Sequence, residues 1–234
     1  MFSILIPTWN NLAYLKLAVA SIRRHSVPSA QPHQIILHIN DGSDGTLAWA
    51  REQGLAYSHT AHNAGICLAV NQAAMQADRP YIVYLNDDMV VCPGWDTRLL
   101  ARIQALPSNL FMVSGTMVEP RASGNACVVV RDFGDDFSMK LWHAGCRHFL
   151  GVGDALVYHF QCKTTGKIVK NDGRAQFLAK WGMTQGSFDR YFLRRGQLLQ
   201  RVGTAGSGAV SEPEDSARFR WAQRKDRWKR RLAG

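Results

Sequence analysis

Three short apolar segments of this sequence alternate with helical patterns, and each segment ends in a polar loop. The apolar segments are residues 2–6, 35–39 and 81–85. Helical patterns follow the first segment, begin again near Thr46 and cover residues 65–76. This alternation predicts an α/β protein with a mostly parallel central sheet that helices cover on both faces. Ligands of such sheets bind beyond the carboxyl ends of the strands.

The second half of the chain predicts further strands, more helix and a separate tail. Strands are predicted near residues 111–114, 127–130 and 155–158, and helices from Asp135-Asp136 and over residues 174–200. A stretch rich in glycine, serine and alanine follows and has the composition of a flexible linker. We therefore expect a globular domain over residues 1–200, a linker over 201–216 and a basic tail over 217–234.

Composition excludes several classes of protein. The chain has 234 residues, of which 46% are hydrophobic, so it is neither disordered nor fibrous. Its longest wholly apolar runs are far shorter than the roughly 18 residues that a membrane-spanning helix needs. The first residues resemble no secretory signal, so we expect a cytoplasmic protein. Five cysteines without a Cys-x-x-Cys pair indicate neither a disulfide framework nor a zinc site.

Two adjacent acids, Asp87 and Asp88, follow the third apolar segment directly. Carboxylates placed this close repel each other, which favours a bound cation between them. Asn86 precedes them and no soft ligands cluster nearby, so the expected ion is Mg²⁺ or Mn²⁺. The alternative is an ordinary solvated turn, because Asn and Asp are common turn residues.

The order and spacing of five motifs resemble those of the family 2 glycosyltransferases. These are inverting enzymes of the GT-A fold that use nucleotide-diphosphate sugars, and the resemblance covers about residues 1–200. The matching motifs are Ser3-Ile4-Leu5-Ile6-Pro7-Thr8-Trp9-Asn10, Asn40-Asp41-Gly42-Ser43, His62-Asn63-Ala64-Gly65, Asn86-Asp87-Asp88 and Asp135-Asp136-Phe137-Ser138.

The resemblance implies a binding site for the nucleotide sugar. Asp41 would accept a hydrogen bond from the pyrimidine N3–H, to which a carboxylate is suited. Asp87 would face the ribose or the donor sugar, and Gly65 would allow close approach of the backbone to the phosphates. The residues implied in donor binding are Pro7, Thr8, Asn10, Asp41, Asn63, Gly65, Asn86 and Asp87.

The resemblance also implies a metal site and a catalytic base. Asp88 would ligate Mn²⁺ or Mg²⁺, and His159 would complete the coordination; a structural histidine is the alternative for His159. Asp136 occupies the position of the general base, which takes the proton from the attacking acceptor hydroxyl. Its alternative role is to cap the helix that begins beside it.

One departure from the family pattern leaves a second interpretation open. Only 48 residues separate Asp88 from Asp136, and the usual glycine-rich segment that shapes the acceptor site is not recognisable between them. The expected function is transfer of a hexose from a UDP- or dTDP-sugar to a glycan or lipid-linked acceptor in cell-surface polysaccharide synthesis. The alternative is a non-catalytic sugar-nucleotide-binding protein that lost the acceptor segment.

The positive charge is concentrated in the tail. From residue 218 to the end, eight Arg or Lys and one acid account for +7 of the total +10. Trp221, Trp228 and Leu232 follow one another at offsets of seven and four, which gives a helix with a narrow apolar stripe. Such a helix can lie on an anionic membrane surface, here the inner face of the membrane. The alternatives are a solvated or packed helix and, ranked lower, a nucleic-acid-binding element.

Overall fold

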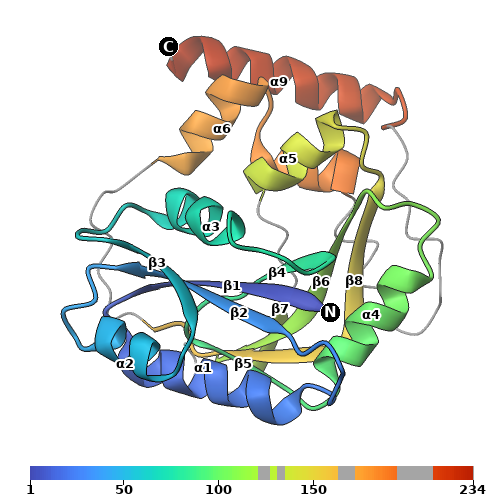
Figure 1. The fold of residues 1–234 in the computed structure, drawn as a ribbon. Coiled ribbons are helices and arrows are strands. Elements are labelled where there is room, and N and C mark those ends of the chain that lie inside the picture. The colour runs from blue at the N-terminus through green and yellow to red at the C-terminus, as the bar shows by residue number, and fades with distance from the viewer. Residues whose placement is uncertain (121–126, 131–134, 163–171, 194–212, 234) are drawn as a thin grey trace. The chain divides into compact units, whose positions relative to one another are not determined.

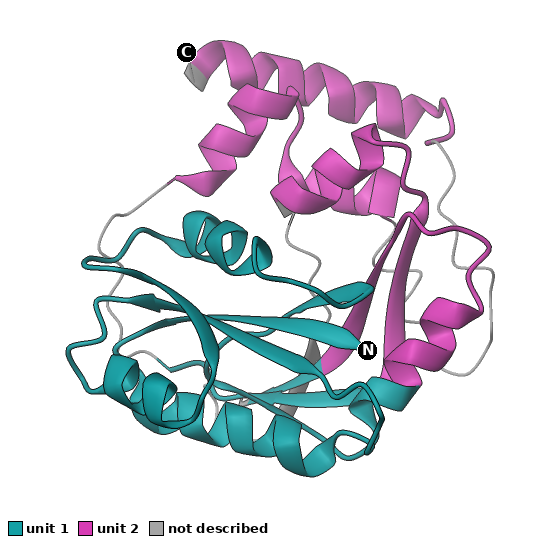
Figure 2. Cartoon of the chain, in the orientation of Figure 1, with its two compact units in different colours: residues 1–97, 117–130, 155–168 teal, residues 98–116, 131–154, 169–234 magenta. Residues whose placement is uncertain are grey.

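A computed structural model describes residues 1–120, 127–130, 135–162, 172–193 and 213–233. The chain divides into two compact units, each of which is built from three separate stretches of sequence. The first unit contains residues 1–97, 117–130 and 155–168, and the second contains residues 98–116, 131–154 and 169–234 (Figure 2). Most of the predicted linker, residues 201–212, lies outside the described residues.

The first unit contains a parallel sheet of four strands in the order β3-β2-β1-β4 (Figure 1). The strands are β1 (Phe2–Trp9), β2 (Gln34–Asn40), β3 (Ala56–Thr60) and β4 (Tyr81–Tyr84). β1 pairs with β2 on one side and with β4 on the other. Every side chain of β1 from Phe2 to Thr8 is buried, which explains the nearly unbroken apolar run in the sequence.

Helices cover both faces of this sheet, as the sequence predicted. α1 (Leu12–His25) and α2 (Thr46–Glu52) lie on one face, and α3 (Ile66–Ala74) lies on the other (Figure 1). The buried side of α1 consists of residues at three- and four-residue spacing: Leu15, Ala18, Val19 and Ile22. On the other face, Ala73 of α3 packs with Leu5 and Ile36 of the sheet.

A second sheet, which the sequence analysis did not anticipate, has the strand order β5-β8-β6-β7. Its strands are β5 (Met89–Val91), β6 (Phe111–Pro120), β7 (Cys127–Val130) and β8 (His148–His159). β5 pairs with β8 in antiparallel register, so that Met89 lies opposite His159. The strand predicted at residues 155–158 is therefore the end of a much longer strand that begins at His148.

The second unit is largely helical. Its elements include α5 (Asp135–His143), α6 (Gly173–Trp181), α7 (Gln185–Phe188), the π-helix η1 (Asp189–Leu193) and α9 (Ala217–Ala233), while α4 (Trp95–Gln104) begins in the first unit. Its core packs Met139, Trp142, Cys146, Phe149, Phe177, Phe188 and Leu193 together. The helical pattern predicted for residues 174–200 is confirmed as far as Leu193, where the described residues stop. Of the helices that the structure describes, none has the length and hydropathy needed to span a bilayer.

A buried histidine and a buried aspartate connect the start of β2 to the start of α4. His33 Nε2 lies 3.0 Å from Asp96 Oδ2, and the same oxygen accepts a hydrogen bond from Val27 N–H. The other ring nitrogen of His33 accepts a hydrogen bond from Phe2 N–H. Burial lowers the pKa of His33 from its ordinary value of 6.5, although Asp96 opposes this shift. His33 is therefore neutral in the folded protein at pH 7.

We expect this histidine to make folding sensitive to mild acid. As pH falls below 6.5, the unfolded chain binds a proton that the folded chain resists, so the free energy of unfolding decreases. The contribution of one such group cannot exceed about 1.4 kcal/mol per pH unit. Urea denaturation of the wild type and of His33→Gln between about pH 5 and pH 8 measures it. The wild type should lose stability more steeply, whereas the control His62→Gln, at an exposed position, should follow the wild type. Parallel curves for the wild type and His33→Gln would contradict the explanation.

Candidate active site

Six of the eight candidate donor-site residues follow the carboxyl ends of the four parallel strands, whereas Pro7 and Thr8 are buried within β1 near its carboxyl end. Asn10 follows β1, Asp41 follows β2, the loop with Asn63 and Gly65 follows β3, and Asn86 to Asp88 follow β4. Parallel strands end at the same edge of a sheet, so the topology brings these residues to one side of the first unit (Figure 1). His159, at the end of β8, belongs to the same unit.

Asn10 and Asp41 bind each other across the ends of β1 and β2. Asn10 Nδ2 donates to Asp41 Oδ2 at 2.9 Å, and Gly42 N–H donates to Asn10 Oδ1 at 3.0 Å. Both residues have positive φ angles, 47° for Asn10 and 63° for Asp41, a region that non-glycine residues adopt rarely and that Asn and Asp tolerate best. The hydrogen bonds from Asn10 and Ser43 lower the pKa of Asp41, so its carboxylate is ionised at neutral pH.

Asn40, which the sequence analysis quoted only as part of a motif, holds the next loop in place. Its buried side chain accepts a hydrogen bond from Ala64 N–H at 2.8 Å and donates to the carbonyl oxygen of Thr8 at 3.3 Å. Within that loop, Asn63 Oδ1 accepts from Gly65 N–H at 2.9 Å, which turns the chain into α3. Asn40 therefore ties the ends of β1 and β2 to the loop that contains Asn63 and Gly65.

The pKa values of the two adjacent acids, Asp87 and Asp88, are shifted in opposite directions. Burial raises the pKa of Asp87 to about 6, although the polar groups of Thr8 and Asn11 oppose this shift. Burial would also raise the pKa of Asp88, but hydrogen bonds from His159 and from Cys162 N–H outweigh it and hold the pKa below its ordinary value. Asp88 is thus the firmly ionised member of the pair.

His159 lies between Asp88 and a third acid, Glu119, which the sequence analysis missed. Its Nε2 is 3.3 Å from Asp88 Oδ1, and its Nδ1 is 2.5 Å from Glu119 Oε1. The two carboxylates raise the pKa of His159 to about 9, with Asp88 contributing most. Glu119 lies on β6, 40 residues from His159, and no local pattern in the sequence marks it as a partner.

Asp88 and His159 are suited to a divalent cation, although Glu119 does not point to the same place. Glu119 contacts Nδ1 of His159 and Asp88 lies beside Nε2. Because the pKa of His159 is about 9, Nε2 carries a proton at neutral pH and could ligate an ion beside Asp88 Oδ1 only after losing it. In the part of the chain that the structure describes, no three His, Cys, Asp or Glu side chains converge to hold a metal ion. Two protein donors suit an ion such as Mg²⁺, which keeps most positions for substrate phosphates and water.

Asp136, the candidate base, belongs to the second unit. It lies in the first turn of α5, and Lys180 Nζ donates to both of its oxygens, at 2.8 and 3.0 Å. Trp181 Nε1 donates to Oδ1 at 2.8 Å, and Lys140 is 3.3 Å from Oδ2. Burial would raise the pKa of Asp136, but these groups outweigh it and lower the pKa, so the carboxylate is ionised.

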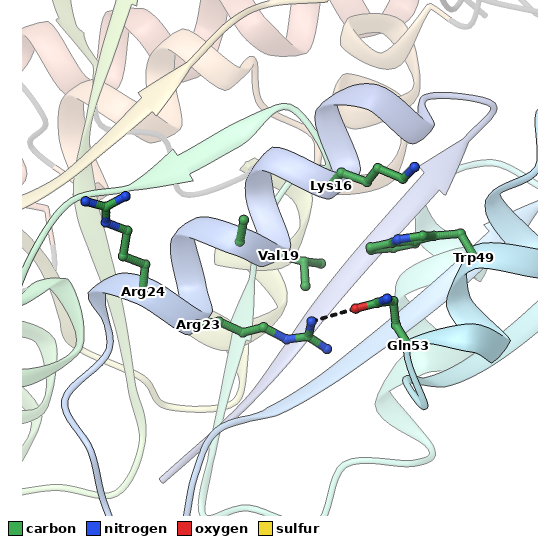
Figure 3. A pocket seen from close by; sticks show the side chains of 7 residues that line it. Lys16, Val19, Arg23, Arg24, Trp49 and Gln53 are labelled. Atoms are coloured by element: carbon green, nitrogen blue, oxygen red, sulfur yellow. Dashed lines mark hydrogen bonds between the residues drawn. The ribbon is translucent and has the colours of Figure 1, made fainter.

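A hollow of about 500 Å³ lies elsewhere, between α1 and the end of α2 (Figure 3). It is lined by Lys16, Val19, Ala20, Arg23, Arg24, Trp49 and Gln53. Arg23 donates to Gln53 Oε1 at 2.7 Å across it (Figure 3). It includes none of the candidate site residues, so we do not assign the predicted function to it.

A model of the family described as "Glycosyl transferase family 2" matches residues 3–136, which is more than half of the chain. The chain belongs to glycosyl transferase family 2. The match includes all the candidate donor-site residues and ends at Asp136. The predicted fold class of this family 2 protein is confirmed: it has a parallel sheet flanked by helices, and a helix ends the described chain.

Solved structures similar to this family 2 chain include those of S. aureus TarS. Residues 1-349 of TarS are 18% identical with a TM-score of 0.42, over 53% of this chain and 37% of that chain. The same TarS fragment in complex with UDP-GlcNAc is 19% identical with a TM-score of 0.42, over 50% of this chain and 33% of that chain. The similar region therefore spans about a third of the TarS fragment. No curated protein sequence matches this chain.

Gly42 allows the loop that contains Asp41 to turn, and we expect alanine there to destabilise this family 2 protein. Gly42 has φ of +79°, and a Cβ atom would lie 2.9 Å from Ile39 Cγ2. Gly54 has a similar φ of +61°, but a Cβ atom there would meet nothing within 4 Å. Gly54→Ala should therefore cost about 1 kcal/mol, whereas Gly42→Ala should cost about 2–3 kcal/mol in urea denaturation. Equal losses in the two variants would show that contact with Ile39 is unimportant.

Proposed function

We propose that this family 2 protein is an inverting, metal-dependent glycosyltransferase that moves a hexose from a UDP- or dTDP-sugar to a glycan or lipid-linked acceptor. Cell-surface polysaccharide synthesis is the process that fits such acceptors. The observation that carries the proposal is the gathering of the donor-site motifs at the carboxyl edge of one parallel sheet in a chain of this family. Their side chains are held there by the hydrogen bonds between β1, β2 and the following loops.

The chemistry of Asp41 favours a uracil or thymine nucleotide. Both bases carry an N3–H donor, and an ionised carboxylate can accept this hydrogen bond because both of its oxygens are free of protons. Asn10 binds one oxygen of Asp41 and thereby fixes the carboxylate before a ligand arrives. A preorganised acceptor loses less conformational entropy when the base binds. We assign Pro7 and Thr8 to the same pocket, and Asn63 and Gly65 to the ribose and phosphates.

We assign the metal ion to Asp88 and His159. Glu119 accepts from Nδ1 of His159 and orients the ring, so that Nε2 would face the ion. Because the pKa of His159 is about 9, a bound ion would displace the proton from Nε2. Mn²⁺ or Mg²⁺, when bound, stabilises the negative charge that develops on the departing diphosphate. Asn86 and Asp87 would contact the donor's sugar or ribose. Because the pKa of Asp87 is about 6, its carboxylate can accept a hydrogen bond from a sugar hydroxyl at neutral pH.

We assign the role of general base to Asp136. In the reaction, the acceptor hydroxyl oxygen bonds to the anomeric carbon while the bond from that carbon to the diphosphate oxygen breaks. The diphosphate leaves with the electron pair, and the hydroxyl proton passes to Asp136. Lys180 and Trp181 keep Asp136 deprotonated and fix its direction, although the lowered pKa also reduces the proton affinity of the carboxylate.

Calorimetry with UDP, dTDP, GDP and CMP, each with and without Mn²⁺, tests the donor site. We expect one pyrimidine diphosphate to bind, and to bind in a Mn²⁺-dependent manner. Asp88→Asn should lose the Mn²⁺ dependence, and Glu119→Gln should weaken Mn²⁺ binding by about tenfold or more because His159 loses its orienting partner. The control Asp78→Asn removes an exposed carboxylate that pairs only with its neighbour Arg79 in the described ion pairs. If all four nucleotides fail to bind, the assignment of a donor site is wrong.

A substitution of the candidate general base, Asp136, tests its role in sugar transfer separately from donor binding. Asp136→Asn should lower the rate of sugar transfer by at least about a hundredfold while nucleotide binding by calorimetry stays unchanged. Asparagine can still accept the hydrogen bond from Trp181, so the second unit should remain folded. Asp154→Asn, at an exposed ion pair with Arg98, is the matched control. Tight donor binding without transfer to any of a panel of glycan and lipid-linked acceptors would instead support a non-catalytic sugar-nucleotide-binding protein.

A further inference from the structure

One side of helix α9 is buried within the second unit. Asp226 is only 3% exposed, and its Oδ2 accepts a hydrogen bond from Thr184 N–H at 3.0 Å. Phe219 packs on Tyr191 with ring centroids 5.0 Å apart, and Ala222 is also buried. At about 100° per residue these three residues of α9 lie along one stripe of the helix. The rotation of α9 about its own axis is therefore fixed by packing.

A different stripe of α9 exposes large apolar side chains. Trp221, Trp228 and Leu232 are 63%, 62% and 67% exposed. Their offsets of seven and four place them within about 40° of one another around the helix, and well away from the stripe of Asp226. Because α9 already packs on α6 and η1 through its other side, this stripe is not the core-facing side of an ordinary surface helix. Large apolar side chains that are exposed together on one side of a helix are typical of an interaction surface.

Exposed basic residues border the tryptophan stripe on both sides. Helical spacing places Arg220, Arg224, Arg227 and Arg231 along one border and Arg218, Lys225 and Lys229 along the other. Lys225 Nζ lies 5.1 Å from the centre of the Trp221 ring, so cationic and aromatic groups meet at the border. The one acid of α9, Asp226, is turned into the protein and does not reduce the positive charge at the stripe.

We propose that α9 docks on an anionic lipid bilayer, with Trp221, Trp228 and Leu232 inserted at the level of the headgroups and the flanking Arg and Lys on lipid phosphates. Apolar side chains flanked by cations on both sides are complementary to this boundary, where acyl chains lie below a negatively charged surface. Leu232 extends the stripe and has no part in stacking on bases, which favours lipid over single-stranded nucleic acid. The inference is independent of the transfer reaction and would hold for a binding protein as well.

Sedimentation of the full chain with vesicles tests the proposal. We expect binding to vesicles of phosphatidylcholine mixed with phosphatidylglycerol and at least about tenfold weaker binding to phosphatidylcholine alone. Trp221→Ser with Trp228→Ser should weaken binding to the anionic vesicles by about tenfold or more. Both positions are exposed, so circular dichroism should show an unchanged fold. Gln223→Ser is the matched control, because Gln223 is exposed on α9 away from the stripe.

Quenching by brominated lipids measures insertion directly. Trp221→Phe with Trp228→Phe keeps the apolar stripe, so this variant should still bind to the vesicles. It should lose most of the quenching of tryptophan fluorescence that the full chain shows. Equal vesicle binding by the full chain and the serine variant would overturn the proposal. A second result would also overturn it. If a single-stranded oligonucleotide releases the full chain from the vesicles, and if the serine variant does not bind that oligonucleotide, the stripe is a nucleic-acid-binding surface.

Discussion

The burial of β1 from Phe2 to Thr8 is the constraint on which the first unit depends. A strand without a solvated face needs backbone partners on both edges and apolar cover on both faces. β2 and β4 supply the partners, while α1 and α3 contribute to the cover. Since all neighbouring strands run parallel, their polar ends meet at one edge. The requirement to bury seven consecutive side chains thus also determines where the candidate donor site forms.

The polar side chains at that edge are held in place by hydrogen bonds to one another and to the backbone. Asp41 is fixed by Asn10, the loop after β3 by Asn40, and Asp88 by Cys162 N–H and His159. Partly buried carboxylates are stable only when such donors compensate for lost hydration. Asp87 has less compensation, and its pKa of about 6 is the consequence. The two acids are therefore suited to different ligands: Asp88, with its lowered pKa, to a cation, and Asp87, with its raised pKa, to hydrogen bonds from sugar hydroxyls.

In the second unit, one short stretch supports both features to which we assign a role. Lys180 and Trp181, at the end of α6, hold the carboxylate of Asp136. Thr184, three residues further on, binds Asp226 and so fixes the rotation of α9. The core around Trp142 and Phe188 anchors this stretch. A change that loosens the turn between α6 and α7 would therefore disturb the candidate base and the candidate membrane helix together.

The sequence by itself determined the α/β class, the three polar loops and the amphipathic pattern of the tail, because each depends on periodicity or on motifs within a few residues. The tertiary structure alone decided the partner of His159, since Glu119 lies 40 residues away on another strand. It also decided the second sheet, whose antiparallel pairing joins Met89 to His159, and the burial of Asp226 against Thr184. Contacts between distant segments leave no local pattern, because only the packing of the whole chain brings their partners together.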